Sequence, residues 1–316
     1  MELRHLRYFL AVAQTGHITR AATQLGMQQP PLSQQIKALE KHLGMALFHR
    51  RPRGVTLTDG GRLFQVEAQR ILQDVDAMKM RMERVAKGWL GQLHVGFTSS
   101  AAAHEFTPEA LQACRKRYPE IELVLSEDNA AELTEGVASG RLHCGFLRVP
   151  VFRPEGLAFE TLLREPVVVA LSTGHALLKG RNKPRTLSIN DLRDQALVLV
   201  RRPGAPGLYA NLLTLCGEHG FQPRIAAEVT RMMTNLSLVA AGAGVSVVPA
   251  SMLGAHPKSV VYCPLAESAR LDAPLTLVYR TEDHAAGPMA NFLALTRKIA
   301  TRHRGENHFA QDLQEP

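Results

Sequence analysis

The segment MQQPPLSQQIKALEKHLG, residues 27–44, constrains the fold more than any other part of the chain. Proline has no N–H group to donate, but the first turn of a helix leaves its N–H groups unpaired, so the two prolines fit a helix start. Apolar residues then recur at three- and four-residue steps and predict one buried stripe: Leu32, Ile36, Leu39 and Leu43. Polar residues lie off this stripe near the start of the helix: Gln29, Ser33, Gln34 and Lys37. The segment predicts a helix that presents polar side chains at its leading end.

Two amphipathic helices are predicted before this one. The first has an apolar stripe from Leu3 to Ala13 and is broken by Gly16, and the second runs from Ile18 to a left-handed stop at Gly26. Two short helices joined by a tight turn are typical of a helix-turn-helix, whose second helix enters the DNA major groove. Gln can bond bidentately to adenine, and Ser can bond to bases or phosphates. The alternative is a small three-helix core with a solvated face.

The following segment, LFHRRPRGVTL, predicts a β-hairpin with a basic tip that would form the wing of a winged helix. Its arginines, Arg50, Arg51 and Arg53, would reach phosphates or a narrow minor groove. Residues 1–62 hold nine Lys or Arg and three Asp or Glu, so +6 of the formal net charge of +8 lies in a fifth of the chain. Such a concentration favours a polyanionic partner, although a solvated basic turn is the alternative.

A long helix is predicted from Asp59, with Thr58 as its N-cap. Its apolar residues alternate steps of four and three, which predicts a coiled-coil seam over about three heptads. The seam consists of Phe64, Ala68, Ile71, Val75, Met78, Met82 and Val85. A helix this long would leave its stripe exposed to water, so the pattern implies a dimer. Packing of the stripe on the chain's own downstream domain is the alternative.

The first sixty residues keep the spacing AA..L…QP.LS.QI..LE..LG..LF.R..R.V.LT..G and resemble the N-terminus of LysR-type transcriptional regulators. The resemblance implies a winged helix-turn-helix domain at 1–58 and a linker or dimerisation helix at 59–90. It implies a bacterial, cytoplasmic regulator that binds double-stranded DNA as a homodimer or, as the family favours, a homotetramer, and that affects access for RNA polymerase. The residues that would read DNA are Gln29, Pro30, Ser33, Gln34, Lys37, Arg50, Arg51 and Arg53. The base sequence, and the choice between activation and repression, stay open.

After glycines at 88 and 91, strand-like runs alternate with helical ones, which predicts an α/β fold with parallel sheets. The predicted strands are 93–97, 122–125, 142–146, 167–171, 197–200, 245–248 and 275–278. The predicted helices are 108–118, 131–139, 209–219, 232–241 and 288–302. More than 200 residues suggest an effector domain at 91–302 with two lobes and a cleft between them: lobe one 92–163 and 269–300, lobe two 164–268. A flexible tail is predicted at 303–316.

Ligands of open α/β sheets bind outside the carboxyl ends of the strands, and that rule selects the candidate effector residues. Hydroxyls and N–H groups after the first strand could seat a carboxylate, or could simply cap a helix. Arginines after two other strands could clamp a carboxylate bidentately. Asn129, after the second strand, is a weaker candidate, and Met232 begins a predicted helix. The candidate effector residues are Thr98, Ser99, Ser100, Asn129, Arg148, Arg201, Arg202 and Met232.

The resemblance extends to about residue 300 through VGFTSSA and LVAAGAGVSVVPAS, and it implies a two-lobed, Rossmann-like domain similar to periplasmic binding proteins. It is closest to regulators of aromatic or dicarboxylic acid breakdown, which implies a small organic acid as inducer. Ala130 departs from relatives that carry a hydroxyl for the inducer carboxylate there, and Arg201 and Arg202 could offset that loss.

Other chemistries have weak sequence support. The glycines of GAGVSVVP follow a predicted helix and precede a strand, which is the reverse of a dinucleotide fingerprint. The histidines show no metal-ligand spacing, and the strand ends carry no nucleophile–base–acid set, so neither a metal, a cofactor nor an enzyme is expected. The four cysteines lack a Cys-x-x-Cys pair, which leaves a redox-sensing regulator as a minor alternative centred on Cys216.

A membrane protein is not expected, because the chain has no apolar run of about 18 residues and no secretory signal core. A cytoplasmic solute-binding protein with an incidental basic head is the remaining alternative. It would bind DNA weakly and without the salt dependence of phosphate contacts.

Overall fold

The computed structural model describes the chain except residues 53, 151, 180–185, 201–206, 285–286 and 313–316, and side chains are described as far as residue 304. The chain divides into two compact units, Met1–Arg84 and Val85–Pro316, which are described separately.

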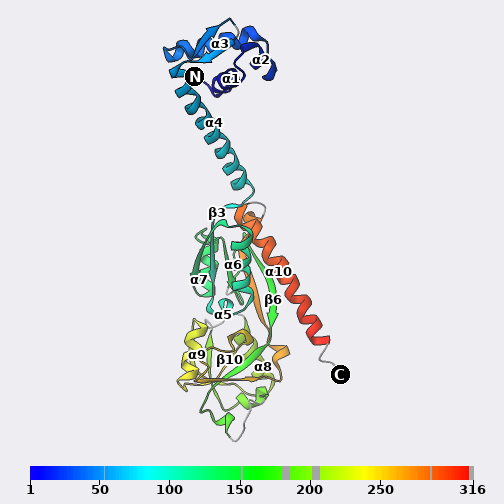
Figure 1. Ribbon diagram of the computed structural model, residues 1–316. Coiled ribbons are helices and arrows are strands. Elements are labelled where there is room, and N and C mark those ends of the chain that lie inside the picture. Colours follow the sequence, from blue (N-terminus) through cyan, green and yellow to red (C-terminus); the bar gives the residue numbers. More distant parts are fainter. Residues whose placement is uncertain (53, 151, 180–185, 201–206, 285–286, 313–316) are drawn as a thin grey trace. The chain divides into compact units, whose positions relative to one another are not determined.

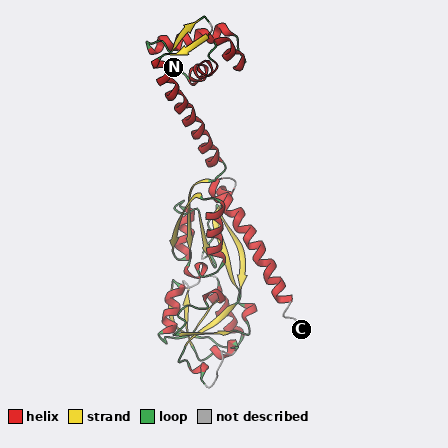
Figure 2. Cartoon of the chain, viewed as in Figure 1, coloured by secondary structure: helices red, strands yellow, loops and turns green. Residues whose placement is uncertain are grey.

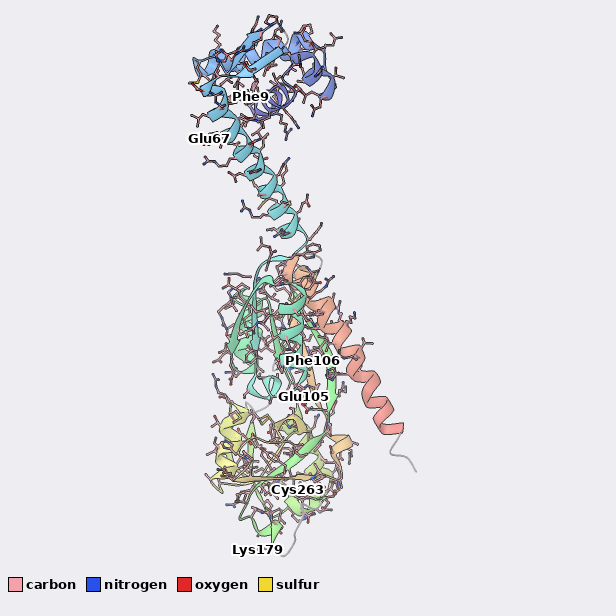
Figure 3. The ribbon with its side chains drawn as sticks, viewed as in Figure 1. Phe9, Glu67, Glu105, Phe106, Lys179 and Cys263 are labelled. Carbon is pink, nitrogen blue, oxygen red and sulfur yellow. The ribbon has the colours of Figure 1, made fainter. Side chains whose placement is uncertain are left out.

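The first unit has the predicted winged helix-turn-helix. Its three short helices are α1 (Leu3–Thr15), α2 (Ile18–Gln24) and α3 (Gln29–Leu43). Phe9 of α1 is fully buried among residues of the two other helices and the wing, and Figure 3 labels it in this core. Both prolines of the opening segment lie in the first turn of α3, and the buried residues of that helix are the predicted Leu32, Ile36 and Leu39. Local apolar periodicity therefore determines which side of α3 remains exposed.

The wing is the antiparallel pair β1 (Phe48–Arg51) and β2 (Gly54–Leu57), in which Phe48 pairs with Leu57. The amide of Val55 donates to the carbonyl of Gly16, with 2.8 Å between N and O, so the wing is bonded to the turn between α1 and α2. Gly54 permits this approach, because a Cβ built at its φ of +137° would lie 2.4 Å from the Gly16 carbonyl oxygen.

Helix α4 (Asp59–Ala86) begins where the sequence predicts and ends four residues before the predicted boundary at 90. The Thr58 hydroxyl accepts a hydrogen bond from the amide of Gly61, with 2.9 Å between the atoms, as expected of an N-cap.

The second unit has two lobes in which helices pack against sheets (Figures 1 and 2). Lobe one contains a five-stranded sheet in the order β4-β3-β5-β12-β6. The strands are β3 (Leu90–Phe97), β4 (Glu120–Glu127), β5 (Cys144–Leu147), β6 (Leu157–Glu165) and β12 (Ala273–Arg280). Its helices are α5 (Ser99–Ala102), α6 (Phe106–Arg117), α7 (Ala130–Ala138) and α10 (Gly287–Asp312).

Lobe two contains a three-stranded sheet in the order β10-β7-β11 and a parallel pair, β8 with β9. The strands are β7 (Val167–Ser172), β8 (Ala196–Val200), β9 (Arg224–Val229), β10 (Ser246–Pro249) and β11 (Val260–Pro264). Its helices are α8 (Leu208–Glu218) and α9 (Met232–Ala240), with 3-10 turns at Ala176–Leu178, Ile189–Leu192, Ala250–Met252 and Ser268–Arg270. A further 3-10 turn, Thr281–His284, follows β12.

The expectation of parallel sheets is wrong in part, because both large sheets contain antiparallel pairs. β12 returns from lobe two and inserts between β5 and β6, antiparallel to both, and β7 is antiparallel to both of its neighbours. Strands β6, β9 and β11 were not predicted. The chain therefore passes from lobe one to lobe two after β6 and returns to lobe one before β12.

Helix α10 also differs from the prediction, since it continues to Asp312 where a loose tail was expected from residue 303. Side chains fasten this end of the helix to lobe one. The Arg304 guanidinium donates to the Leu162 carbonyl at 3.0 Å, and the His303 ring contacts the Glu109 carboxylate at 2.6 Å.

Candidate functional site

The predicted DNA-reading residues lie on one compact unit, on α3 and β1. Gln29, Pro30, Gln34 and Lys37 are exposed, and Ser33 is half-buried. They lie off the buried stripe of α3. Arg50 and Arg51 are exposed on β1, and Arg53 lies outside the described residues. The exposed side of α3 therefore offers amide, hydroxyl and ammonium groups, with guanidinium groups on the wing.

Glu40 positions the wing and was not singled out from the sequence. Its Oε1 accepts hydrogen bonds from the amides of Leu47 and Phe48, with N–O distances of 2.9 and 3.1 Å. The carboxylate of α3 thus holds the start of β1 against the recognition helix. The only sign of this role in the sequence is that Glu40 is an isolated acidic residue in a basic segment.

The predicted dimerisation seam on α4 is divided in the structure. The Phe64 ring packs edge-on against Phe9, with centroids 4.8 Å apart, and Ala68 is buried, so this end of the seam packs on the chain's own helix-turn-helix core. The far end differs: Met78, Met82 and Val85 are exposed. Phe64 is half-buried and packs against the helix-turn-helix core, because the stripe begins beside an apolar surface of its own domain.

In the second unit, a cleft is lined by residues of both lobes. It encloses about 1000 Å³ of space, part of it open to solvent. Six of the eight predicted effector residues line it: Thr98, Ser99, Ser100, Asn129, Arg148 and Met232. The other two, Arg201 and Arg202, lie outside the described residues. The strand-end rule therefore brings together residues that are more than 130 positions apart in the sequence.

Four helices begin at the wall of this cleft. The lining includes the residues at the N-termini of α5, α7, α8 and α9, namely Thr98 and Ser99, Asn129 and Ala130, Gly207 and Leu208, and Arg231 and Met232. The N-terminus of a helix carries a partial positive charge and unpaired N–H groups, so several such ends favour a negative group. The rest of the wall includes the Asp128 carboxylate, which lies 3.6 Å from the Arg141 guanidinium, and Thr230. Its other residues are largely apolar: Val149, Val200, Ala210, Pro249, Ala273 and Pro274.

Two of the predicted residues act as caps. The Thr98 hydroxyl accepts a hydrogen bond from the amide of Ala101 at 3.3 Å. The Asn129 Oδ1 accepts from the amides of Ala131 and Glu132, each at 3.0 Å. Thr98 therefore makes the capping contact that was the alternative for its position, and Asn129 makes a capping contact that was not predicted.

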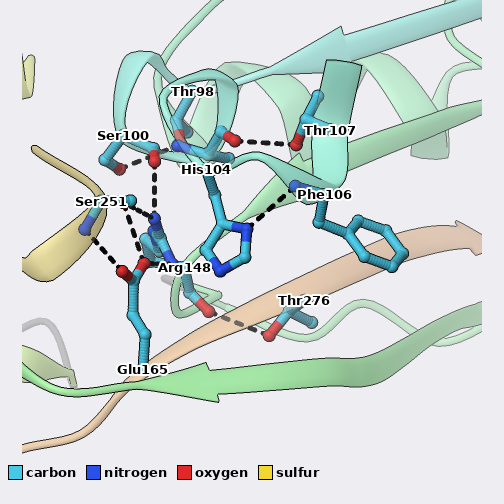
Figure 4. Close-up of polar contacts among 10 residues, drawn as sticks. Thr98, Ser100, His104, Phe106, Thr107, Arg148, Glu165, Ser251 and Thr276 are labelled. Atoms are coloured by element: carbon cyan, nitrogen blue, oxygen red, sulfur yellow. Dashed lines mark hydrogen bonds and ion pairs between the residues drawn. The ribbon is translucent and has the colours of Figure 1, made fainter. Parts of the chain in front are cut away.

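Arg148 lines the cleft, and both terminal nitrogens of its guanidinium contact protein groups, while its buried Nε has no hydrogen-bond partner among the described residues. One terminal nitrogen lies 2.5 Å from Glu165 Oε1, and the other donates to the Ser100 carbonyl at 2.6 Å and to the Ser251 hydroxyl at 2.9 Å (Figure 4). Burial lowers the pKa of Arg148, and the Glu165 carboxylate opposes that effect. Ser251 also donates its amide to Glu165 at 2.7 Å, so the network joins lobe one to lobe two.

His104 lies beside this network. Its Nδ1 accepts a hydrogen bond from the amide of Phe106 at 3.1 Å. Burial lowers the pKa of His104, Glu165 opposes that shift, and Arg148 reinforces it. The ring is therefore held in the neutral form that this hydrogen bond requires.

Tyr209 and Arg231 line the cleft and were missed in the sequence. The Tyr209 hydroxyl is buried 3.4 Å from the Ser246 hydroxyl. Arg231 precedes α9, and its guanidinium lies 3.4 Å from Glu127 at the end of β4, on the other lobe. Arg231 follows β9, which the sequence did not reveal, so the strand-end rule could not select it.

The four cysteines, all within the described residues, are buried and form no disulfide. Burial raises the pKa of Cys114 and of Cys216 to about 11, and raises that of Cys144 further. Thiolates are the reactive form, so these thiols are unsuited to rapid oxidation.

The described part of the chain has no group of three His, Cys, Asp or Glu side chains that could hold a metal ion. Among the same residues, none of the helices combines the length and the hydropathy of a transmembrane span.

Comparison with known proteins gives the same division of the chain. Residues 3–62 match the family described as bacterial regulatory helix-turn-helix protein, lysR family, and residues 86–300 match the LysR substrate binding domain. The chain is 35% identical to the HTH-type transcriptional regulator AlsR of Bacillus subtilis over 284 residues, which cover 90% of this chain and 92% of that protein. It is 36% identical to BudR of Raoultella terrigena over 280 residues, 89% of this chain and 95% of BudR.

Among solved structures, the chain resembles full-length CbnR in complex with its target DNA. The TM-score is 0.77 at 30% sequence identity, and the match covers 95% of this chain and all of CbnR. The chain belongs to the LysR family of bacterial helix-turn-helix transcriptional regulators.

Proposed function

We propose that this regulator responds to a small organic acid bound in the cleft of its second unit. The observation that carries the proposal is the convergence of the N-termini of three helices of nine or more residues, α7, α8 and α9, on a largely apolar wall. The helix ends favour a carboxylate, and the apolar residues favour a short aromatic or aliphatic body. The carboxylate of such an acid would lie at the helix N-termini, and its hydrocarbon part would contact the apolar wall.

The first unit supplies the DNA contacts in this proposal. Phosphate contacts from lysines and arginines would supply affinity, and Gln29, Ser33 and Gln34 would supply the choice of bases. Exposed apolar residues on α4 support pairing of two copies, which would place two recognition helices on two half-sites. We infer that the working form is a homodimer or homotetramer, that it alters access for RNA polymerase, and that it works with DNA in the bacterial cytoplasm without a cofactor or enzymatic activity.

The inducer can act only through a difference in its affinity for two arrangements of the assembly. The cleft walls belong to both lobes, so a ligand that contacts both favours one lobe arrangement. In an oligomer, such a change would alter the spacing of the recognition helices or the bend of bound DNA.

A thermal-shift screen of the full chain tests the acid directly. Acids and their uncharged amides would be compared at equal concentration: acetate with acetamide, benzoate with benzamide, and succinate with succinamide. A ligand of the folded state raises the melting temperature, so at least one acid should raise it and its amide should not. The proposal is wrong if the amides stabilise the protein as well as the acids do, or if no acid stabilises it.

A further inference from the structure

Two arginines among the described residues line the cleft, and their surroundings differ. Arg148 lies at the junction of the lobes, where its side chain is 13% exposed and that of Glu165 is 9% exposed. Arg231 lies at the start of α9, where its side chain is 46% exposed and that of Glu127 is 45% exposed. The comparison decides which guanidinium is able to meet a ligand.

The two terminal nitrogens of Arg148 are held by its present partners, and its buried Nε has no hydrogen-bond partner among the described residues. Moving its guanidinium toward a ligand would leave the buried Glu165 carboxylate without its cation and would break the bonds to Ser100 and Ser251. Breaking a buried ion pair costs more than a single new carboxylate contact returns. Arg148 therefore holds the wall of the cleft in place.

Arg231 has a weak and replaceable partner. Its contact with Glu127 joins the end of β4 in lobe one to α9 in lobe two, at 3.4 Å and close to solvent. Exposed ion pairs of this kind are weak because solvent screens them, so the guanidinium can exchange one carboxylate for another at small cost. Arg231 is also the N-cap of α9, and none of the described hydrogen bonds joins its side chain to that helix end. Its charge and the positive end of a nine-residue helix therefore favour an anion at the same place.

We propose that Arg231 is the residue that binds the carboxylate of the inducer, and that the inducer displaces Glu127 from it. The inference rests on the proposed function, because it assigns the charge partner of an acid in that same cleft. When the ligand enters, the ion pair between Arg231 and Glu127, which joins the two lobes, is replaced by an ion pair between Arg231 and the ligand. Glu127 thus competes with every acid, and an uncharged ligand gains nothing from the exchange.

Two substitutions with opposite predicted effects test the assignment. With whichever of acetate, benzoate or succinate stabilises the wild-type protein most, dissociation constants are measured by calorimetry for the full-length variants. Arg231→Gln should weaken binding about tenfold, because a charge-assisted contact is lost. Glu127→Gln should strengthen binding severalfold, because the competitor is removed. The corresponding amide should bind both variants as it binds the wild type.

The control is Arg270→Gln. Arg270 pairs with Glu218 on lobe two with side-chain exposures of 54% and 48%, and neither residue lines the cleft. This variant should bind the acid unchanged. A merely structural role of the Arg231–Glu127 pair would move both variants in the same direction, and that result overturns the inference. The inference is also overturned if substitution of Arg201 and Arg202 abolishes acid binding while the Arg231→Gln variant binds the acid normally. If no acid binds the wild type, the proposed function itself falls, and the inference falls with it.

Discussion

The Arg148 guanidinium and the Glu165 carboxylate lie 2.5 Å apart at the junction of the two lobes, where both are almost completely buried. Arg148 extends from the end of β5 and Glu165 ends β6, while Ser251, which contacts both, belongs to lobe two. The lobes are therefore joined by a charged network at the edge of the cleft that the proposed inducer would enter.

Glu165→Gln should destabilise the protein strongly, because it leaves the Arg148 charge buried without a counterion. We expect a loss of about 3–5 kcal/mol in the free energy of unfolding of this domain, measured by urea denaturation. Asp272→Asn is the control, since its pair with Arg164 is exposed and should contribute less than about 1 kcal/mol. Equal effects of the two substitutions would contradict the assigned role of the pair.

Acid should destabilise the second unit through three partly buried histidines. Burial is the largest cause that lowers the pKa of His104, His143 and His175 in the folded chain. As the pH falls below about 6.5, the ordinary pKa of histidine, the unfolded chain takes up protons before the folded chain does, so stability is lost. His104→Asn keeps an acceptor for the Phe106 amide and cannot titrate. Its melting temperature should fall less than that of the wild type between pH 7.5 and 5.5, and an equal fall would show that His104 contributes nothing.

Substitutions on the recognition helix should separate base choice from affinity. Gln34→Ala should reduce the preference for one sequence, whereas Lys37→Ala should weaken binding to all sequences and reduce the slope of log affinity against log salt by about 0.9. Fluorescence anisotropy on labelled duplexes measures both. Lys79→Ala on α4, where Lys79 pairs with Asp76, should leave the slope unchanged. A slope unaffected by Lys37→Ala would remove that residue from the phosphate contacts.

Two exposed methionines on α4 should differ in their effect on self-association. Met82 belongs to the predicted seam and Met80 does not, although their exposed fractions, 57% and 54%, are nearly equal. Met82→Asp should shift sedimentation velocity profiles toward smaller species, and Met80→Asp should not. The seam assignment fails if both variants sediment alike. Phe64→Ala should instead destabilise the helix-turn-helix by about 0.5–3 kcal/mol, because its half-buried ring packs on Phe9.

Peroxide should leave the regulator unaffected. The Cys216 thiol is buried and its pKa is raised to about 11, so the thiolate is scarce at neutral pH. Treatment with equimolar hydrogen peroxide should change neither the mass of the protein nor its affinity for DNA. Rapid formation of a disulfide or sulfenic acid would restore the redox-sensing alternative.

Local patterns were enough to predict the first unit. The prolines and the apolar spacing of α3, the glycine at residue 16 and the alternation in the wing each act over a few residues, and the structure has these elements where the sequence predicts them. The family membership and the overall fold class are confirmed. The individual DNA and effector contacts stay predictions.

Distant pairings limited the prediction of the second unit. β6 is a strand because β12, more than a hundred residues later, pairs with it, and the sequence LAFETLLRE carries no clear alternation. The ion pair of Arg148 likewise depends on Glu165 and Ser251 meeting at the lobe junction, which no local spacing records. Arg231 escaped notice because β9, with its alanines, is a weak strand signal.

The central claim is that the first unit reads a specific DNA sequence through α3. Selection of the full-length protein on a random duplex library at low ionic strength tests it most directly, with the Ser33→Ala, Gln34→Ala double variant run in parallel. The account predicts that the wild type enriches one sequence with two related half-sites and that the double variant, folded and equally stable, does not. Recovery of no preferred sequence by the wild type, or of the same sequence by both proteins, would contradict it.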